Sequence, residues 1–188
     1  MGFTRAELES YRDATIPDLV GDGLRLLFVG INPGLWTAAT GTPFAHPGNR
    51  FYPALLAAGI IERMPDFAAG LTTAERSALI ARGIGITNLV RRATARADEL
   101  SRDELRDGAA RLEQDVARWR PRVVAVVGVT AYRHGFGRPR AVAGMQPERI
   151  AGGQLWVVPN PSGLNAHDTV ATLAEAYAAP ARAAGVLG

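Results

Sequence analysis

Cysteine and lysine are both absent from this 188-residue chain, and each absence excludes a class of chemistry. Without cysteine the chain has no disulfide, thiolate nucleophile, zinc finger or iron–sulfur cluster. Without lysine no side-chain amine is present to form a Schiff base. The three histidines, His46, His134 and His167, lack the close spacing of metal ligands. We therefore expect neither a metal site nor a cofactor.

Long apolar runs are missing as well. No stretch of 18 residues is apolar enough to cross a membrane, and residues 1–22 lack the apolar centre of a signal peptide. These absences predict a cytoplasmic protein with no membrane partner. All 21 basic residues are arginines, and they give a net charge of +3. This mild basic bias is compatible with a phosphate-rich partner but does not by itself identify one.

Apolar residues are plentiful and arranged in short runs. At 47% hydrophobic content, 188 residues can build one sizeable core but hardly two, so we predict one domain over residues 1–188. Apolar, often β-branched runs predict buried strands at residues 26–30, 83–90, 123–128 and 154–159. Such runs suit strands that are covered by helices on both faces.

Helix signals alternate with these strands. Capping boxes begin at Thr4, Thr72 and Ser101, and Asn49 and Asp168 are candidate caps for two further helices. We expect residues 35–48 and 135–146 to be long connections and a short helix to begin at residue 130. The order of elements predicts an α/β fold, a three-layer sandwich with a mostly parallel four-stranded central sheet flanked by helices.

The first strand ends in a polar turn, Gly30-Ile31-Asn32-Pro33-Gly34. Ligands of open α/β sheets bind just outside the carboxyl ends of the strands, so Asn32 is the first functional candidate. The alternative is ordinary turn chemistry, in which Asn, Pro and Gly only shape the backbone. The last strand ends in a similar turn, Asn160-Pro161-Ser162-Gly163. If the sheet is parallel, both turns face one cleft.

Four motifs in order make the chain similar to a known family. It resembles the mismatch-specific uracil-DNA glycosylase and thymine-DNA glycosylase family, within the uracil-DNA glycosylase superfamily, over about residues 24–180. The motifs that carry the resemblance are Gly30–Gly34, Gly41–Phe51, Gly85–Val90 and Asn160–Asn165.

This resemblance implies a monofunctional DNA-repair glycosylase. Such an enzyme flips uracil, or a related damaged pyrimidine, out of a G:U-type mismatch in double-stranded DNA and hydrolyses its N-glycosidic bond. Asn32 matches the asparagine that holds the attacking water. An amide cannot take up the proton, so most of the barrier must fall through stabilisation of an oxocarbenium-like sugar and a departing uracil anion. Slow turnover and a monomeric enzyme, nucleoid-associated when on DNA, are the corresponding expectations.

The resemblance also implies residues that bind the base. Ile31 matches a position whose backbone N–H bonds a pyrimidine carbonyl, and Phe44 matches the aromatic residue that stacks on the flipped base. The alternative for Phe44 is a loop anchor on the core. Asn88 and His46 complete the predicted pocket, although His46 equally suits a role in loop geometry.

A second group is expected to engage the duplex. Leu164 matches the wedge that fills the space left by the flipped base, with a hydrophobic staple before the last helix as its alternative. Ser162 and Gly163 offer groups for a phosphate or the widowed guanine. Asn160, Asn165 and Arg91 complete the predicted wedge and backbone contacts. The arginines at 91, 92 and 96 fit a phosphate clamp and an ordinary solvated charge run equally well.

Two departures from the family pattern stand out. Ala166 and His167 follow the wedge region where many relatives carry an arginine. The loop after the second strand is expected to reach Asn32 with Ala93 at its apex, so Ala93 marks a position beside the water at which a carboxylate is missing.

Two other functions remain open. One is a non-catalytic or very slow binder of damaged or mismatched DNA, which the missing carboxylate supports. The other is a small-molecule nucleotide-binding domain, which the absence of GxGxxG and GxxxxGK[ST] loops argues against.

Overall fold

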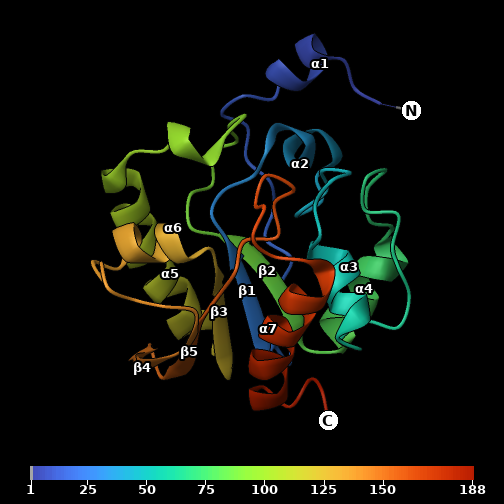
Figure 1. The fold of residues 1–188 in the computed structure, drawn as a ribbon. Helices are drawn as coiled ribbons and strands as arrows, with labels where there is room; N and C mark the ends of the chain where they lie inside the picture. Colours follow the sequence, from blue (N-terminus) through green and yellow to red (C-terminus); the bar gives the residue numbers. More distant parts are fainter. Residues whose placement is uncertain (1) are drawn as a thin grey trace.

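The strand β1 (Leu26–Gly30) is an interior strand of the sheet (Figure 1). In the computed structural model, which describes residues 2–188, β1 pairs in parallel with β2 (Ile84–Asn88) and β3 (Val123–Val127). β5 (Gly153–Val158) pairs in parallel with β3, and the strand order is β2-β1-β3-β5-β4. Every residue of β1 and β3 is buried, as strands covered on both faces require.

The sheet has five strands rather than the predicted four. The additional strand, β4 (Gly144–Ile150), pairs antiparallel with β5 at the edge of the sheet, and its first three residues fall within the connection expected at residues 135–146. Gly144 and Pro147 obscure the alternation that would reveal a strand, and an edge strand tolerates proline because one side of its backbone needs no partner. The α/β class and the mostly parallel sheet are confirmed.

The helical segments largely follow the predicted signals. All three capping boxes are confirmed, at Thr4, Thr72 and Ser101. The segments are α1 (Arg5–Glu9), α2 (Leu35–Thr40), α3 (Phe51–Ala57), α4 (Thr73–Ala81), the 3₁₀ turn η1 (Ala97–Glu99), α5 (Arg102–Trp119), α6 (Val129–Gly135) and α7 (Val170–Ala183).

Three local predictions need correction. The connection 35–48 is not loop throughout, because α2 occupies its first part. Thr169 rather than Asp168 caps α7, since the Thr169 hydroxyl accepts a hydrogen bond from the backbone of Thr172. Asn49 is not the N-cap residue of α3, although its side-chain oxygen accepts from the Phe51 N–H at 2.9 Å.

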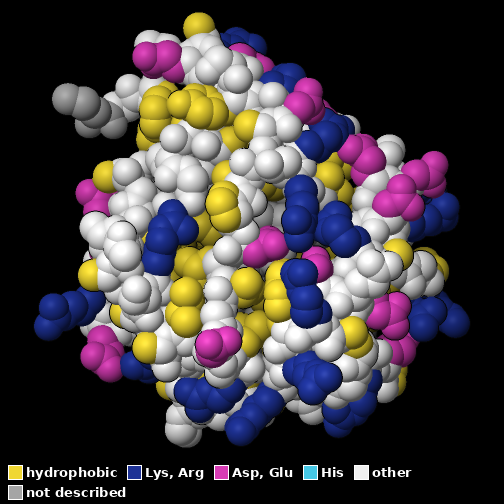
Figure 2. All heavy atoms as spheres, turned by 180° about the vertical axis from the view of Figure 1, so that it is seen from behind, with side chains coloured by type: hydrophobic (Ala, Val, Ile, Leu, Met, Phe, Trp, Pro, Cys, Tyr) yellow, Lys and Arg dark blue, Asp and Glu magenta, His cyan; other side chains and the backbone are white. Residues whose placement is uncertain are grey.

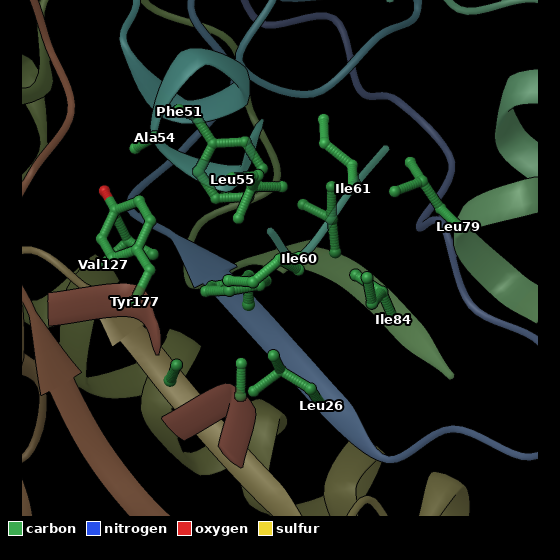
Figure 3. Close-up of a cluster of buried hydrophobic side chains, with 14 of the residues drawn as sticks. Leu26, Phe51, Ala54, Leu55, Ile60, Ile61, Leu79, Ile84, Val127 and Tyr177 are labelled. Atoms are coloured by element: carbon green, nitrogen blue, oxygen red, sulfur yellow. The ribbon is translucent and has the colours of Figure 1, made fainter. Parts of the chain in front are cut away.

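An apolar core lies on each face of the sheet. On one face, side chains from α3, α4 and α7 converge on the strands, as Figure 3 shows for Leu55, Leu79 and Tyr177 above Leu26 and Ile84. On the other face, α5 and α6 pack against the sheet. Leu105, Ala109, Leu112 and Val116 of α5 are buried there. These two layers of helices make the predicted sandwich.

The parallel strands bring their carboxyl ends to one edge of the sheet. Arginines and carboxylates lie interspersed on the face shown in Figure 2. Within residues 2–188 no helix is both long and apolar enough to span a bilayer.

Candidate active site

A cleft of about 590 Å³ opens at the carboxyl ends of the parallel strands. Both Asn-Pro turns border it, so the prediction that they face one cleft is confirmed. Ala93, Asn165 and Arg91 do not line it. The predicted site residues that do are Ile31, Asn32, Phe44, His46, Asn88, Asn160, Ser162, Gly163 and Leu164.

The Asn32 side chain is held in one orientation. Its Nδ2 donates to the backbone oxygens of Pro33 (3.2 Å) and Arg92 (3.0 Å) and to the Thr94 hydroxyl (2.8 Å). Backbone oxygens only accept hydrogen bonds, so the group that faces them must be the NH₂. Oδ1 accepts nothing from residues 2–188 and is not sealed from solvent. The amide therefore presents a fixed, unused acceptor at the cleft.

Thr94 is the residue of the loop after β2 whose side chain bonds Asn32, and the sequence did not single it out. Its hydroxyl donates to the Arg96 oxygen (2.8 Å), which leaves a lone pair for Asn32 Nδ2. The Thr94 N–H donates to Pro33 O (3.1 Å) and so joins the two loops. Threonine in a strand-to-loop turn is common, and nothing in the sequence marked it beyond its position after β2.

Ala93 does not occupy the place that the sequence suggested. It is fully buried, and its backbone pairs with the N-terminal segment through Asp13 N–H to Ala93 O (2.9 Å) and Ala93 N–H to Ala14 O (2.8 Å). The expectation of a side chain at the loop apex facing the cleft is therefore wrong. The next residue, Thr94, is the one whose side chain contacts Asn32.

Asn88 and Phe44 form the floor of the cleft, and both side chains lie close to Gly30 at the end of β1. A Cβ atom at Gly30 would lie 2.6 Å from Asn88 Oδ1 and 3.3 Å from Phe44 Cζ, so only glycine allows both side chains to lie over the end of β1. One face of the Phe44 ring stacks on Phe51, with centroids 4.0 Å apart. Phe44 nonetheless lines the cleft, so anchoring on the core and lining the pocket are compatible.

The backbone at Phe44 is strained. Its φ of 57° lies in the left-handed region, which costs a bulky residue on the order of 1 kcal/mol or more. The neighbouring loop is fixed by the Tyr52 hydroxyl, which donates to Pro43 O at 3.0 Å. Burial raises the pKa of Tyr52, so this donor keeps its proton. The loop therefore holds the ring over the cleft against a local conformational cost.

His46 and Ile31 both line the cleft. His46 Nδ1 accepts from the Gly48 N–H (3.1 Å), and the ring packs edge-on against Trp36 at 5.9 Å. This contact supports a role in loop geometry, and the exposed ring still borders the cleft. Ile31 follows β1 directly, and its oxygen accepts from the Val90 N–H at 2.9 Å.

The second turn presents Leu164 to solvent. Asn160 Oδ1 accepts from the Ser162 N–H (3.0 Å), and Ser162 Oγ accepts from the Leu164 N–H (3.3 Å), so each polar side chain braces its own loop. Leu164 is 88% exposed. It does not pack as a hydrophobic staple, and its apolar side chain projects beside the cleft.

Arg50 holds this loop in place and was missed from the sequence. Its guanidinium donates to the backbone oxygens of Ser162 (2.6 Å), Asn165 (2.6 Å) and Asp168. Asn165 also braces the loop, because its Nδ2 donates to Asn160 O (2.9 Å) and to Asp168 Oδ2 (2.8 Å). An arginine that lies 112 residues from Ser162 along the chain gives no local signal of such a contact.

Comparison with known proteins assigns the family. A model of the uracil DNA glycosylase superfamily matches residues 17–180. The chain belongs to this superfamily. A solution NMR structure of a "putative Uracil DNA glycosylase" from Methanosarcina acetivorans has the same fold, with a TM-score of 0.61 at 16% identity over 91% of this chain and 98% of that one. The region matched by the superfamily model contains both Asn-Pro turns, whereas α1 precedes it.

The arginines after β2 in this superfamily member are paired with carboxylates. Arg91 bonds Asp18 (2.9 Å) and Asp115 (3.3 Å), Arg92 bonds Glu104 and Asp13, and Arg96 bonds Asp98. The Arg92 hydrogen bond lowers the pKa of Glu104 to about 2. These pairings favour a solvated charge run over the phosphate clamp that the sequence left open.

Arg111 of α5 fixes the carboxyl end of β2. Its Nη2 donates to the backbone oxygens of Asn88 (2.9 Å) and Leu89 (2.6 Å), and burial lowers its pKa. A Cβ atom at Gly108, one turn earlier in α5, would lie 2.2 Å from Leu89 O. Such close packing sets the position from which Asn88 reaches the cleft.

Proposed function

We propose that this protein is a monofunctional DNA glycosylase that flips uracil, or a related damaged pyrimidine, from G:U-type mismatches and hydrolyses its N-glycosidic bond. Superfamily proteins act on DNA as glycosylases. The observation that carries the proposal is the Asn32 amide, whose NH₂ is consumed by the protein and whose oxygen is left for a ligand. The assignment to the mismatch-specific branch rests on the four motifs and belongs to the proposal.

In this mechanism Asn32 Oδ1 accepts a hydrogen bond from water and aims the water's lone pair at the sugar carbon. A neutral amide does not remove the proton, so Asn32 contributes orientation more than basicity. The single carboxylate among the cleft-lining residues of 2–188 is Glu9, which pairs with Arg12. Bond breaking must therefore run ahead of water attack, with the charge stabilised by polar groups around the departing base.

Recognition of the base is assigned to the floor of the cleft. The exposed side of Phe44 would stack on the flipped pyrimidine, while the Asn88 amide and the Ile31 backbone offer groups for its polar edge. Leu164 would enter the duplex and replace part of the lost stacking. The chain contains no lysine, so hydrolysis would leave an abasic site without a Schiff-base intermediate.

The test is base release from three matched duplexes. U:G, T:G and U:A duplexes are incubated with enzyme under single-turnover conditions and then treated with alkali to cut at abasic sites. We expect release from U:G to exceed release from U:A, with an intact strand until alkali is added. Binding without release would instead identify a damaged-DNA binder. Trapping of a protein–DNA adduct by borohydride would contradict the monofunctional assignment.

A further inference from the structure

The N-terminal segment, residues 3–14, borders the cleft. Its helix α1 stands above α2 at the end of the molecule where the second Asn-Pro turn emerges (Figure 1). Three of its residues, Arg5, Leu8 and Glu9, line the cleft together with Asn32 and Thr94. We call residues 3–14 the strap. It forms one wall of the site although the superfamily model begins only at residue 17.

Both ends of the strap contact the rest of the protein. Near its start, the Phe3 ring packs edge-on against Trp36 of α2, with centroids 5.0 Å apart. Near its end, the strap backbone makes the two hydrogen bonds to buried Ala93 described above, each contributing about 0.5–1.5 kcal/mol. The strap thus bridges α2 and the loop after β2, the two walls beside Asn32. These contacts fix the position of the strap beside the cleft.

The carboxylates on the strap are already engaged. Glu7 accepts from the Thr4 backbone and hydroxyl in the capping box of α1 (2.7 and 2.8 Å). Glu9 pairs with Arg12 (2.9 Å), and Asp13 pairs with Arg92 (3.1 Å). Their charges are therefore partly compensated within the protein.

Arg5 differs from its neighbours. Its side chain is exposed and makes no ion pair or hydrogen bond with any of residues 2–188. It is also the one arginine among the described residues that line the cleft. A guanidinium binds phosphate through paired N–H groups, and an exposed, unpaired one at a cleft mouth can do so without breaking an existing contact.

We infer that the strap is a DNA-binding element and that Arg5 pairs with a backbone phosphate of the strand whose nucleotide enters the cleft. The inference rests on the proposed function, because it assumes that DNA is the ligand. Phosphate contacts position a protein on the duplex without reading sequence. Arg5 would therefore hold the strand beside Asn32, while the floor of the cleft reads the base.

The test compares two arginine variants with equal loss of charge. Arg5→Gln removes the strap arginine. Arg120→Gln removes an exposed arginine whose side chain makes no ion pair or hydrogen bond within residues 2–188. Arg120 follows α5 and precedes the amino end of β3, at the end of the sheet opposite the cleft. Affinity for a U:G duplex and for an undamaged duplex is measured between 50 and 200 mM salt. Arg5→Lys, which keeps the charge, is the rescue variant.

For Arg5→Gln we expect several-fold weaker binding to both duplexes and a log Kd against log salt slope smaller by about 1. Arg120→Gln should leave the slope near that of the wild type, and Arg5→Lys should restore most of it. If Arg5→Gln and Arg120→Gln behave alike, Arg5 makes no phosphate contact. Tighter binding or faster base release by Arg5→Gln would show that the strap opposes DNA entry and would equally overturn the inference.

Failure of this inference is distinguishable from failure of the proposed function. If the wild-type protein neither binds the U:G duplex nor releases uracil, the proposed function itself is wrong. If it does both and Arg5→Gln leaves the slope unchanged, only the role of the strap is wrong. Equal melting temperatures of the three variants would exclude misfolding as the cause.

Discussion

The two Asn-Pro turns share a sequence pattern and use their asparagines in opposite ways. After β1, Asn32 gives its NH₂ to the protein and keeps its oxygen free. After β5, Asn160 gives its oxygen to the Ser162 N–H and so closes its own turn. The first amide leaves its oxygen to a ligand, whereas the oxygen of the second amide holds its own turn. The difference arises from the neighbours, since only Asn32 lies beside the acceptors of the loop that contains Thr94.

The two Asn-Pro turns are also held in place by different contacts. The first turn is fixed through the side chain that faces the cleft, whereas the second is fixed from behind by Arg50 and by Tyr177, whose hydroxyl donates to Pro159 O at 3.0 Å. Burial raises the pKa of Tyr177, so this donor stays protonated. The second turn can therefore expose Leu164 without losing its shape. One turn orients an acceptor, and the other displays an apolar side chain.

The comparison predicts the largest effect for paired alanine variants of the two asparagines. Asn32→Ala should lower single-turnover uracil release by about 100-fold or more, because a positioned polar group acting on the reaction is lost. Its DNA affinity should stay within a few-fold of the wild type, since phosphate contacts dominate binding. Asn160→Ala should lose only a few-fold in release. Equal losses in the two variants would show that the asparagines do not differ in role.

Arg50→Lys tests the support of the second turn. A lysine cannot reach three carbonyl oxygens at once, so we expect about 10-fold slower release and a lower melting temperature from unpaired carbonyls. Arg25→Lys is the matched control, because Arg25 also donates to two backbone oxygens, those of Gly185 and Arg82, away from the cleft. It should lower stability without slowing release. Fluorescence of 2-aminopurine beside the uracil reports insertion of Leu164 and should drop only in Arg50→Lys.

Thr94→Val tests how the first amide is oriented. Valine keeps the shape of threonine but offers no acceptor to Asn32 Nδ2, and loss of a neutral hydrogen bond of about 1 kcal/mol corresponds to roughly 5-fold slower release. Thr94→Ser keeps the hydroxyl and should retain near wild-type rates. Release by Thr94→Val at the wild-type rate would mean that the two backbone acceptors alone orient the amide.

The smallest predicted effect is on the free energy of unfolding, through the ion pair between Arg92 and Glu104. The pKa of Glu104 is lowered to about 2, mainly by the hydrogen bond from Arg92. A carboxyl with a lowered folded pKa stabilises the fold above its ordinary pKa near 4.5 and stops doing so as pH falls toward 2. Glu104→Gln should therefore cost about 1 kcal/mol at pH 7, after allowance for solvent screening, and the difference should vanish toward pH 2.

Chemical denaturation of both proteins at several pH values measures this difference. Asp103→Asn is the control, since the Asp103 side chain is 86% exposed in its pair with Arg106. It should change stability little at any pH. A Glu104→Gln deficit that stayed constant from pH 7 to pH 2 would assign the effect to the helix cap instead of the ion pair.

The sequence by itself determined the elements that depend on local chemistry. Apolar β-branched runs place the strands that helices cover on both faces, and hydroxyl–glutamate spacing places the caps at Thr4, Thr72 and Ser101, because both signals act within a few residues. Local patterns also predicted that both Asn-Pro turns lie at one edge of the sheet, since parallel strands share a direction. The sequence pattern did not predict β4, because a half-exposed edge strand needs little apolar patterning.

Tertiary structure alone decided what each polar group at the cleft does. Whether an asparagine presents its oxygen or consumes it depends on acceptors supplied from 60 residues away, as Arg92 does for Asn32. The burial of Ala93 depends on pairing with the strap, and the shape of the Leu164 loop depends on Arg50. Hydrogen bonds between distant segments leave no periodic trace in a sequence, because the partner is chosen by the folded geometry and not by spacing along the chain.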